Sequence, residues 1–141
     1  MRADAVLLDT CALIWLTRGE LSPPTVEALA AAAAARGVFV SPVTAWDIGQ
    51  LSRPRAGRLR LALSPDPEAW LADVLARPEI GVAPLTPTAA LAAAFLPEPL
   101  HGDPADRLLI ATAREIDAAL ATRDENILAY GKAGHVRVLV C

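Results

Sequence analysis

Four aspartates lie at points where the chain is expected to leave a strand or to begin a helix: Asp9, Asp47, Asp106 and Asp124. Each stands beside an apolar run, where an unbalanced charge is costly. If the fold brings the four carboxylates together, a cation must relieve their mutual repulsion, and oxygen ligands suit Mg²⁺ or Mn²⁺. A cation held in this way makes water more acidic and offsets charge on a leaving oxygen. The residue types therefore predict metal-dependent phosphodiester hydrolysis, provided that the four positions converge.

The elements that would position these aspartates alternate between short apolar strands and helices. Strands are expected over 5–9, 38–41, 80–85, 118–122 and 136–140, and helices over 10–16, 24–36, 44–51, 66–77, 86–96, 103–113 and 124–130. This order is typical of an α/β fold with a largely parallel sheet between helical layers. Because ligands bind beyond the carboxyl ends of such strands, the four aspartates are expected to line one crevice.

Asp103 and Asp106 could also have purely structural roles at the start of a helix. Asp103, followed by Pro104, is predicted to cap a helix whose first residue is the proline. Asp106, three residues after the cap, is then either a metal ligand or the capping-box partner of Asp103. The sequence alone leaves both roles open.

The remaining acids differ in how easily a structural role accounts for them. Asp124 can cap the helix that follows it, and Asp47 can be an exposed helical acid. Asp9 resists such an interpretation most, because it ends an apolar strand that is expected to be central and buried on both faces. Thr10 can orient a carboxylate or a bound water, or it can cap the following helix.

Composition limits the kind of protein that this is. The chain has 141 residues, 54% of them hydrophobic, which suits one domain with a substantial core. The net charge of −3 argues against binding nucleic acid through a broad basic surface, but not against an enzyme that grips phosphate through metal ions. The arginine cluster, formed by Arg53, Arg55, Arg58 and Arg60, is either a phosphate-binding segment or a solvated connector.

Other features indicate a cytoplasmic protein. No apolar stretch is long enough for a membrane span, and the residues after Met1 lack the pattern of a signal peptide. Cys11 and Cys141 are expected to be reduced thiols, with Cys11 packed as a small apolar residue. The two histidines, His101 and His135, are not expected to take part in the chemistry, because neither has a second ligand type at a useful spacing.

Several segments resemble a known family. The run VLLDTCALIWL from Val6 to Leu16 is similar to the opening of PIN-domain toxins of the VapC type, and HGDPADRLLIATA, from His101 to Ala113, resembles their third acidic motif. LATRD, ending at Asp124, resembles the fourth motif, and the segment over 41–48 is similar to the second. The resemblance implies a PIN-like three-layer α/β/α sandwich with a mainly parallel sheet of about five short strands, and a single domain over 1–141.

The resemblance also implies a function. It indicates the toxin of a type II toxin–antitoxin pair: a Mg²⁺- or Mn²⁺-dependent endoribonuclease, a homodimer, inhibited by a VapB-like antitoxin. By motif, Asp9, Asp47, Asp106 and Asp124 are the catalytic and metal-binding acids, and Asp103 is a supporting residue. The second motif usually carries glutamate where this chain has Asp47, whose shorter side chain could reach the metal through water.

The resemblance leaves further residues with two possible roles each. Arg107 and Arg123 can contact RNA phosphates or pair with neighbouring aspartates. An apolar helical surface around Leu13, Trp15 and Leu16 can receive an antitoxin segment or pack in the core, and core packing is favoured for Leu13. Trp46 is expected to pack beside the site rather than to stack on a base.

Three other classes of protein were weighed against the nuclease. A haloacid dehalogenase-type phosphatase needs a second aspartate where Cys11 stands, and a receiver domain needs an acid adjacent to Asp9. The sequence has neither, so both classes are disfavoured. The main alternative is a catalytically weak or inactive binding module, whose acidic pocket holds a metal or a partner's arginine. The shortened side chain of Asp47 keeps that alternative open.

Overall fold

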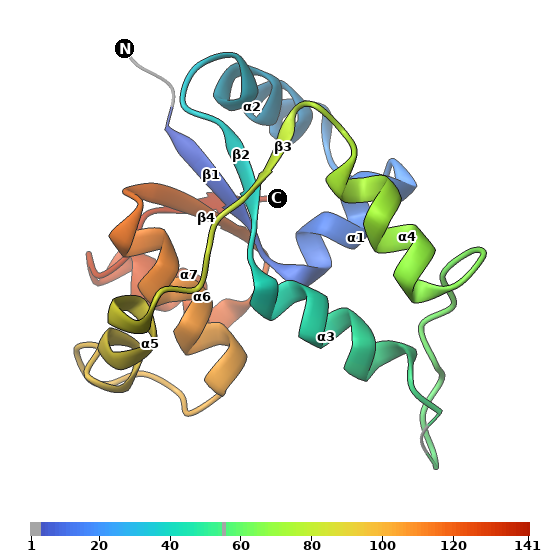
Figure 1. The fold of residues 1–141 in the computed structure, drawn as a ribbon. Helices are drawn as coiled ribbons and strands as arrows, with labels where there is room; N and C mark the ends of the chain where they lie inside the picture. The colour runs from blue at the N-terminus through green and yellow to red at the C-terminus, as the bar shows by residue number, and fades with distance from the viewer. Residues whose placement is uncertain (1–3, 55) are drawn as a thin grey trace.

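The computed structural model describes residues 4–54 and 56–141 (Figure 1). Its centre is a five-stranded sheet in the order β3-β2-β1-β4-β5, in which every neighbouring pair is parallel. The strands are β1 (Ala5–Leu8), β2 (Val38–Val40), β3 (Ile80–Val82), β4 (Ala118–Thr122) and β5 (Val138–Val140). This confirms the predicted α/β class with a parallel sheet. Arg55 of the arginine cluster and the first three residues of the chain lie outside the described residues.

Seven helices surround the sheet in the described part of the chain: α1 (Thr10–Arg18), α2 (Pro23–Ala34), α3 (Pro42–Ser52), α4 (Pro67–Leu75), α5 (Pro87–Ala94), α6 (Pro104–Glu115) and α7 (Glu125–Lys132). Helices α1, α2 and α4 lie on one face of the sheet; α6 and α7 lie on the other, with α5 packed outside α6. None of the described helices is both long and apolar enough to cross a membrane.

Strand β1 shows why this chain forms a three-layer sandwich. All of its residues are buried, and they alternate between two cores. Leu7 packs with residues of α6 and α7, whereas Val6 and Leu8 pack with residues of α1 and α2. A strand that is covered on both faces favours a continuous apolar sequence, and this is the pattern that precedes Asp9.

Several elements differ in length from the sequence-based expectation. Helix α3 begins at Pro42 rather than Thr44, because Ser41 caps it: the Ser41 hydroxyl accepts from the Val43 amide at 3.0 Å, and proline suits the first helical position. Strand β3 ends at Val82, although apolar residues continue to Leu85. Strand β5 is likewise shorter than predicted. Strand β3 pairs only with β2, and β2 ends at Val40 because Ser41 caps α3, so the ladder stops at Val82. Strand β5 pairs only with β4, from Val138 to Val140.

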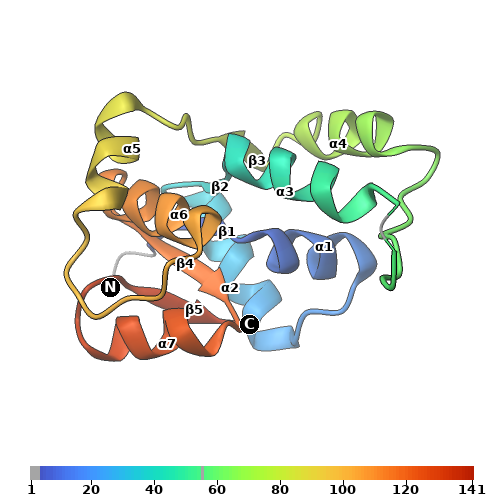
Figure 2. The same cartoon turned by 90° about the horizontal axis from the view of Figure 1, so that it is seen from below.

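The fold brings several chain segments to one end of the sheet. Strands β1 and β4 are neighbours in register from Ala5–Ala118 to Leu8–Ala121, so their carboxyl ends lie side by side. Figure 2, which is seen from below relative to Figure 1, shows α1 and α3 next to each other and α6 beside α3, with α7 farther from both. The aspartates singled out by the sequence stand at or near the starts of these helices.

Candidate functional site

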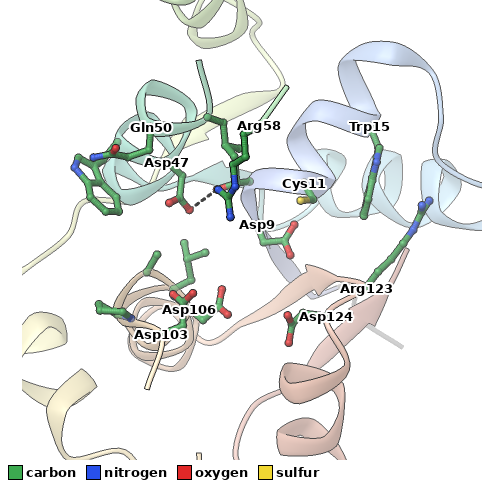
Figure 3. Close-up of a pocket in the computed structure, with 16 residues that line it drawn as sticks. Asp9, Cys11, Trp15, Asp47, Gln50, Arg58, Asp103, Asp106, Arg123 and Asp124 are labelled. Carbon is green, nitrogen blue, oxygen red and sulfur yellow. Dashed lines mark hydrogen bonds between the residues drawn. The ribbon is translucent and has the colours of Figure 1, made fainter. Parts of the chain in front are cut away.

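One cavity of about 780 Å³ lies at the carboxyl ends of β1 and β4. Asp9, Asp47, Asp106 and Asp124 all line it, together with Asp103 (Figure 3). The predicted convergence of the four acids on one crevice therefore occurs. They come from segments far apart in the sequence, so only the tertiary fold brings them together.

Asp9 sits directly after β1 and is only 9% exposed. Its Oδ1 accepts from the Ala12 amide at 2.7 Å, so Asp9 is the N-cap of α1. The capping role considered for Thr10 is therefore wrong. Burial raises the pKa of the Asp9 carboxyl, the Thr122 and Ala12 hydrogen bonds oppose this, and the charges of Asp124 and Asp47 add to it. Because the cap occupies only Oδ1, the other oxygen can serve a ligand.

Asp47 lies in the second turn of α3 and is half-buried, not the exposed helical acid of the structural alternative. Its Oδ2 accepts a hydrogen bond from the Thr10 hydroxyl at 2.9 Å. Burial raises the pKa of Asp47, the Thr10 bond counteracts this, and the charge of Asp103 adds to the rise. Thr10 therefore orients a carboxylate, one of the two roles predicted for it.

The N-terminus of α6 presents two acids with different tasks. Asp103 is the N-cap, as predicted: its Oδ1 accepts from the Asp106 amide at 3.0 Å. The Asp106 carboxylate contacts a histidine, since its Oδ2 lies 2.8 Å from Nε2 of His101. Burial raises the pKa of Asp106, and the His101 contact works against that rise. Asp106 thus faces the cavity and His101 rather than completing a capping box.

His101 is the residue that the sequence reasoning missed. A ring nitrogen of His101 and carboxylate oxygens of Asp106 and Asp124 lie within 4.8 Å of one another, a grouping that could hold a metal ion. The expectation that neither histidine meets a second ligand type is wrong for His101. The available signal was its position two residues before the cap of the helix that carries Asp106.

Asp124 combines a structural role with a place in the cavity. Its Oδ1 accepts from the Ile127 amide at 3.0 Å and caps α7, and its own amide donates to Oγ1 of Thr122 at 3.0 Å. The alternatives considered for Asp124, cap or site residue, are therefore compatible. The cap fixes the carboxylate while leaving one oxygen toward the other acids.

The arginines divide between the frame and the cavity. Arg107 pairs with Glu98 and donates to backbone carbonyls, so the alternative in which it pairs with a neighbouring aspartate is wrong, whereas its contact with an RNA phosphate stays a prediction. Arg123 lies over the Trp15 ring at 3.8 Å and lines the cavity. Arg58 of the arginine cluster also lines it and extends into the space beside Asp47 (Figure 3).

Three expectations about side-chain packing are corrected or settled by the structure. Cys11 is exposed and lines the cavity, because it occupies the outer side of the first turn of α1. Trp46 is 60% exposed at the rim of the cavity, so it is not a packing residue. Leu13 is fully buried in the core and cannot form part of a partner-binding surface.

Comparison with protein families gives one match that spans most of the chain. A family model described as "PIN domain" matches residues 6–133. No match is found among curated proteins.

Solved structures share the fold at low sequence identity. VapBC2 from Rickettsia felis bound to a promoter DNA fragment gives a TM-score of 0.63 at 11% identity, covering 96% of this chain and 97% of the other. FitAcB from Neisseria gonorrhoeae gives a TM-score of 0.60 at 19% identity, covering 96% of each chain. FitAB bound to an IR36 DNA fragment gives 0.58 at 20% identity, covering 95% and 93%. At these identities the likeness concerns the fold.

Proposed function

Because the chain belongs to the PIN-domain family, we propose that it is a toxin of the VapC type, a Mg²⁺- or Mn²⁺-dependent endoribonuclease that hydrolyses phosphodiester bonds in RNA. The observation that carries this proposal is the meeting of Asp9, Asp47, Asp106 and Asp124 around one cavity. Three of them come from the ends of parallel strands or from helix starts, which is where ligands bind in open α/β sheets.

The chemistry of this donor set fits a divalent cation. Burial raises the pKa of Asp9, Asp47 and Asp106, and the charge of at least one nearby aspartate raises each of them further. Such a group of carboxylates is relieved by a positive ion. Asp9, Asp106 and Asp124 would hold the ion, and Asp47 would reach it directly or through water. When bound, the ion would acidify water and offset charge on the leaving oxygen.

The residues around the acids supply positioning. Two of the ligands, Asp9 and Asp124, are helix caps and cannot swing away without losing a backbone hydrogen bond. Thr10 holds the Asp47 carboxylate toward the cavity. Arg58, at the rim, is placed to meet a phosphate of the RNA and so to draw a strand across the acids.

We further propose a VapB-like antitoxin as partner, in keeping with the toxin–antitoxin assemblies of the same fold. An acidic cavity can accept an arginine from an inhibitor in place of a metal. Trp46 and Leu51 are 60% and 40% exposed at its rim and can contact an apolar segment of such a partner. A cytoplasmic homodimer with a single catalytic domain over 1–141 completes the proposal.

The test is cleavage of structured RNA with Mg²⁺ or Mn²⁺, with and without chelator, by wild type and two matched variants. Asp9→Asn removes a proposed ligand but keeps an N-cap acceptor. Asp66→Asn makes the same change at the cap of α4, outside the cavity. We expect Asp9→Asn to lose more activity than the about 10- to 100-fold that follows from changing a residue that only hydrogen-bonds to a ligand, and Asp66→Asn to retain full activity.

Two results would count against the nuclease. Equal, metal-independent cleavage by wild type and Asp9→Asn would assign the activity to a contaminant. Tight Mn²⁺ binding by wild type with no cleavage of any RNA would favour the alternative, a PIN-fold binding module that holds a metal or a partner's arginine.

A further inference from the structure

We infer that His101 is a nitrogen ligand of the metal, which makes this a mixed imidazole–carboxylate centre. The inference rests on the proposed metal-dependent function and adds a ligand of a different chemical type. It starts from the cluster in which a ring nitrogen of His101 and oxygens of Asp106 and Asp124 all lie within 4.8 Å of one another. Among the described residues, this is the group of three whose ligand atoms already lie this close together, so Asp9 would join the same ion through water or after a small movement.

The His101–Asp106 distance is the distance expected between neighbouring ligands. Two ligand atoms at about 2.1 Å from one ion and at right angles are about 3.0 Å apart. Nε2 of His101 and Oδ2 of Asp106 are 2.8 Å apart. An ion beside the two atoms can therefore bind both with little change in their separation, once Nε2 has lost its proton and the imidazole and the carboxylate have turned toward the ion.

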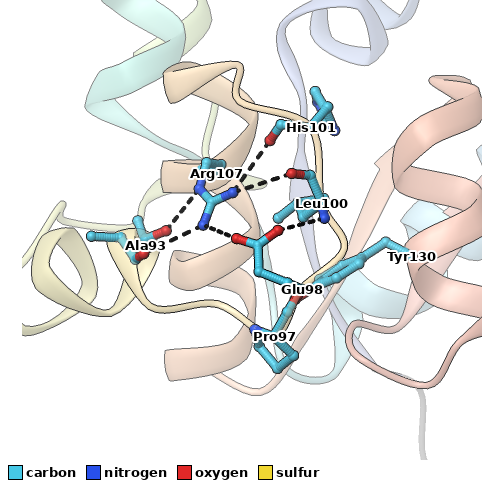
Figure 4. A network of polar contacts seen from close by, with 8 residues as sticks. Ala93, Pro97, Glu98, Leu100, His101, Arg107 and Tyr130 are labelled. Carbon is cyan, nitrogen blue, oxygen red and sulfur yellow. Dashed lines mark hydrogen bonds and ion pairs between the residues drawn. The ribbon is translucent and has the colours of Figure 1, made fainter.

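The backbone of His101 is tied to the helix that carries Asp106. Arg107, the next residue on α6, donates from Nη1 to the carbonyls of His101 and Leu100 at 3.3 and 3.4 Å (Figure 4). Its Nη2 also pairs with Glu98 at 3.3 Å. The loop that bears the imidazole and the helix that bears the carboxylate thus move as one support. Such fixed geometry is what a ligand pair needs.

The surroundings of Nδ1, the other ring nitrogen of His101, indicate how much His101 would contribute to metal affinity. Nδ1 of His101 is buried and has no hydrogen-bond partner among the described residues. A ligating imidazole carries its proton on Nδ1 and usually donates it to a carbonyl or carboxylate, and loss of such a partner costs about 10- to 100-fold in metal affinity. His101 is therefore expected to be a supplementary ligand, with the carboxylates providing most of the affinity.

A nitrogen ligand changes which ions the site prefers. Imidazole is a ligand of first-row transition metals rather than of Mg²⁺, which favours oxygen; Mn²⁺ stands at the weak end of that series and also favours oxygen, but it accepts a nitrogen ligand more readily than Mg²⁺ does. We expect His101→Gln to weaken Mn²⁺ binding by about tenfold and to leave Mg²⁺ binding nearly unchanged. The site would thereby shift from a Mn²⁺-preferring centre toward one that discriminates little between the two ions.

The experiment is pulsed electron paramagnetic resonance of the untagged full chain loaded with Mn²⁺ alone. Coupling from a directly bound imidazole nitrogen is expected in wild type and should change when the protein is labelled with ¹⁵N-histidine. His135→Gln is the matched control, because His135 is the only other histidine in the sequence. The coupling should persist in that variant and disappear in His101→Gln, and ¹⁵N-histidine-labelled His135→Gln, in which His101 is the only histidine left, decides the question even if His101→Gln fails to fold.

The outcomes separate this inference from the proposed function. Mn²⁺ that binds to wild type without nitrogen coupling overturns the role of His101 and leaves an all-oxygen nuclease centre intact. Coupling that survives in His101→Gln also overturns it. Failure of wild type both to bind Mn²⁺ and to cut RNA overturns the proposed function itself.

Discussion

The Thr10 hydroxyl donates a 2.9 Å hydrogen bond to Oδ2 of Asp47, joining two residues that are 37 positions apart. Thr10 is the first residue of α1, and Asp47 lies in α3, so the bond links the two helices at the edge of the acidic cavity. It gives the short Asp47 side chain a fixed direction. The similar family motif usually has a glutamate here, whose side chain is longer than that of Asp47. The hydrogen bond from Thr10 directs the Asp47 carboxylate and so partly compensates for its shorter reach.

This bond leads to the first prediction. Thr10→Val keeps the shape of the side chain but removes the donor, at a cost of about 1 kcal/mol in the free energy of unfolding. Because Asp47 then loses its orientation, we expect Mn²⁺ affinity to fall by up to about tenfold. Isothermal titration with Mn²⁺ measures this. Thr10→Ser retains the hydroxyl and should behave as wild type; unchanged affinity in Thr10→Val would show that Thr10 does not position Asp47.

The second prediction concerns pH and the metal-free protein. The pKa of Asp9 is raised above its ordinary value of 3.8, mainly by burial. A raised pKa means that the folded state binds the proton more tightly than the unfolded state does. The stabilising contribution is therefore present below about pH 3.8 and is lost as the pH rises through the raised pKa. Each unit by which the pKa is raised corresponds to about 1.4 kcal/mol.

Comparison with Asp9→Asn isolates this effect from all other titrating groups. In chelator, the variant should gain stability relative to wild type as the pH rises from 4 to about 8, because asparagine keeps the cap without the charge. Excess Mn²⁺ should instead make wild type the more stable of the two, since metal at about 100 times its dissociation constant adds about 2.7 kcal/mol to the free energy of unfolding of wild type alone. Thermal melts across the pH series give both results. A difference that does not vary with pH would refute the raised pKa.

The parts of the site that the sequence predicts are those set by local pattern. Asp9 follows a continuous apolar run, so its place at the end of a central strand is readable from its neighbours. Asp103 precedes a proline, and this marks a helix cap whatever the rest of the chain does. Such features depend on a few adjacent residues.

The parts that the sequence does not predict depend on contacts between distant segments. The loop before α6 brings His101 to Asp106, and the bonds of Arg107 to that loop hold it there. Neither contact follows from helical or strand periodicity. The packing prediction for Trp46 is wrong for the same reason: whether a helical tryptophan is covered depends on what packs over α3, and at this edge nothing among the described residues does so fully.

The third prediction tests the phosphate-binding role of Arg58. The Asp9→Asn background prevents cleavage under the proposed mechanism, so binding can be measured alone. In that background Arg58→Gln should weaken RNA binding and reduce the slope of log affinity against log salt concentration by about 1, the value for one lost phosphate contact. Arg60→Gln is the matched control, because Arg60 is exposed in the same segment but does not line the cavity. Fluorescence anisotropy over a salt series measures both. Equal losses in the two variants would indicate a general charge effect rather than a contact at the site.

The fourth prediction concerns Arg107, whose side chain is only 14% exposed. Its guanidinium donates to the carbonyls of Ala93, Leu100 and His101 and pairs with Glu98. The single ammonium of Arg107→Lys cannot reproduce the several donors of the guanidinium and leaves carbonyls unpaired. We therefore expect the free energy of unfolding, measured with urea, to fall by about 2–3 kcal/mol. Glu98→Gln should cost less than about 1 kcal/mol, because the Glu98 side chain is 65% exposed and its ion pair is screened. Similar losses in both variants would mean that the ion pair, rather than the carbonyl contacts, holds the loop that carries His101.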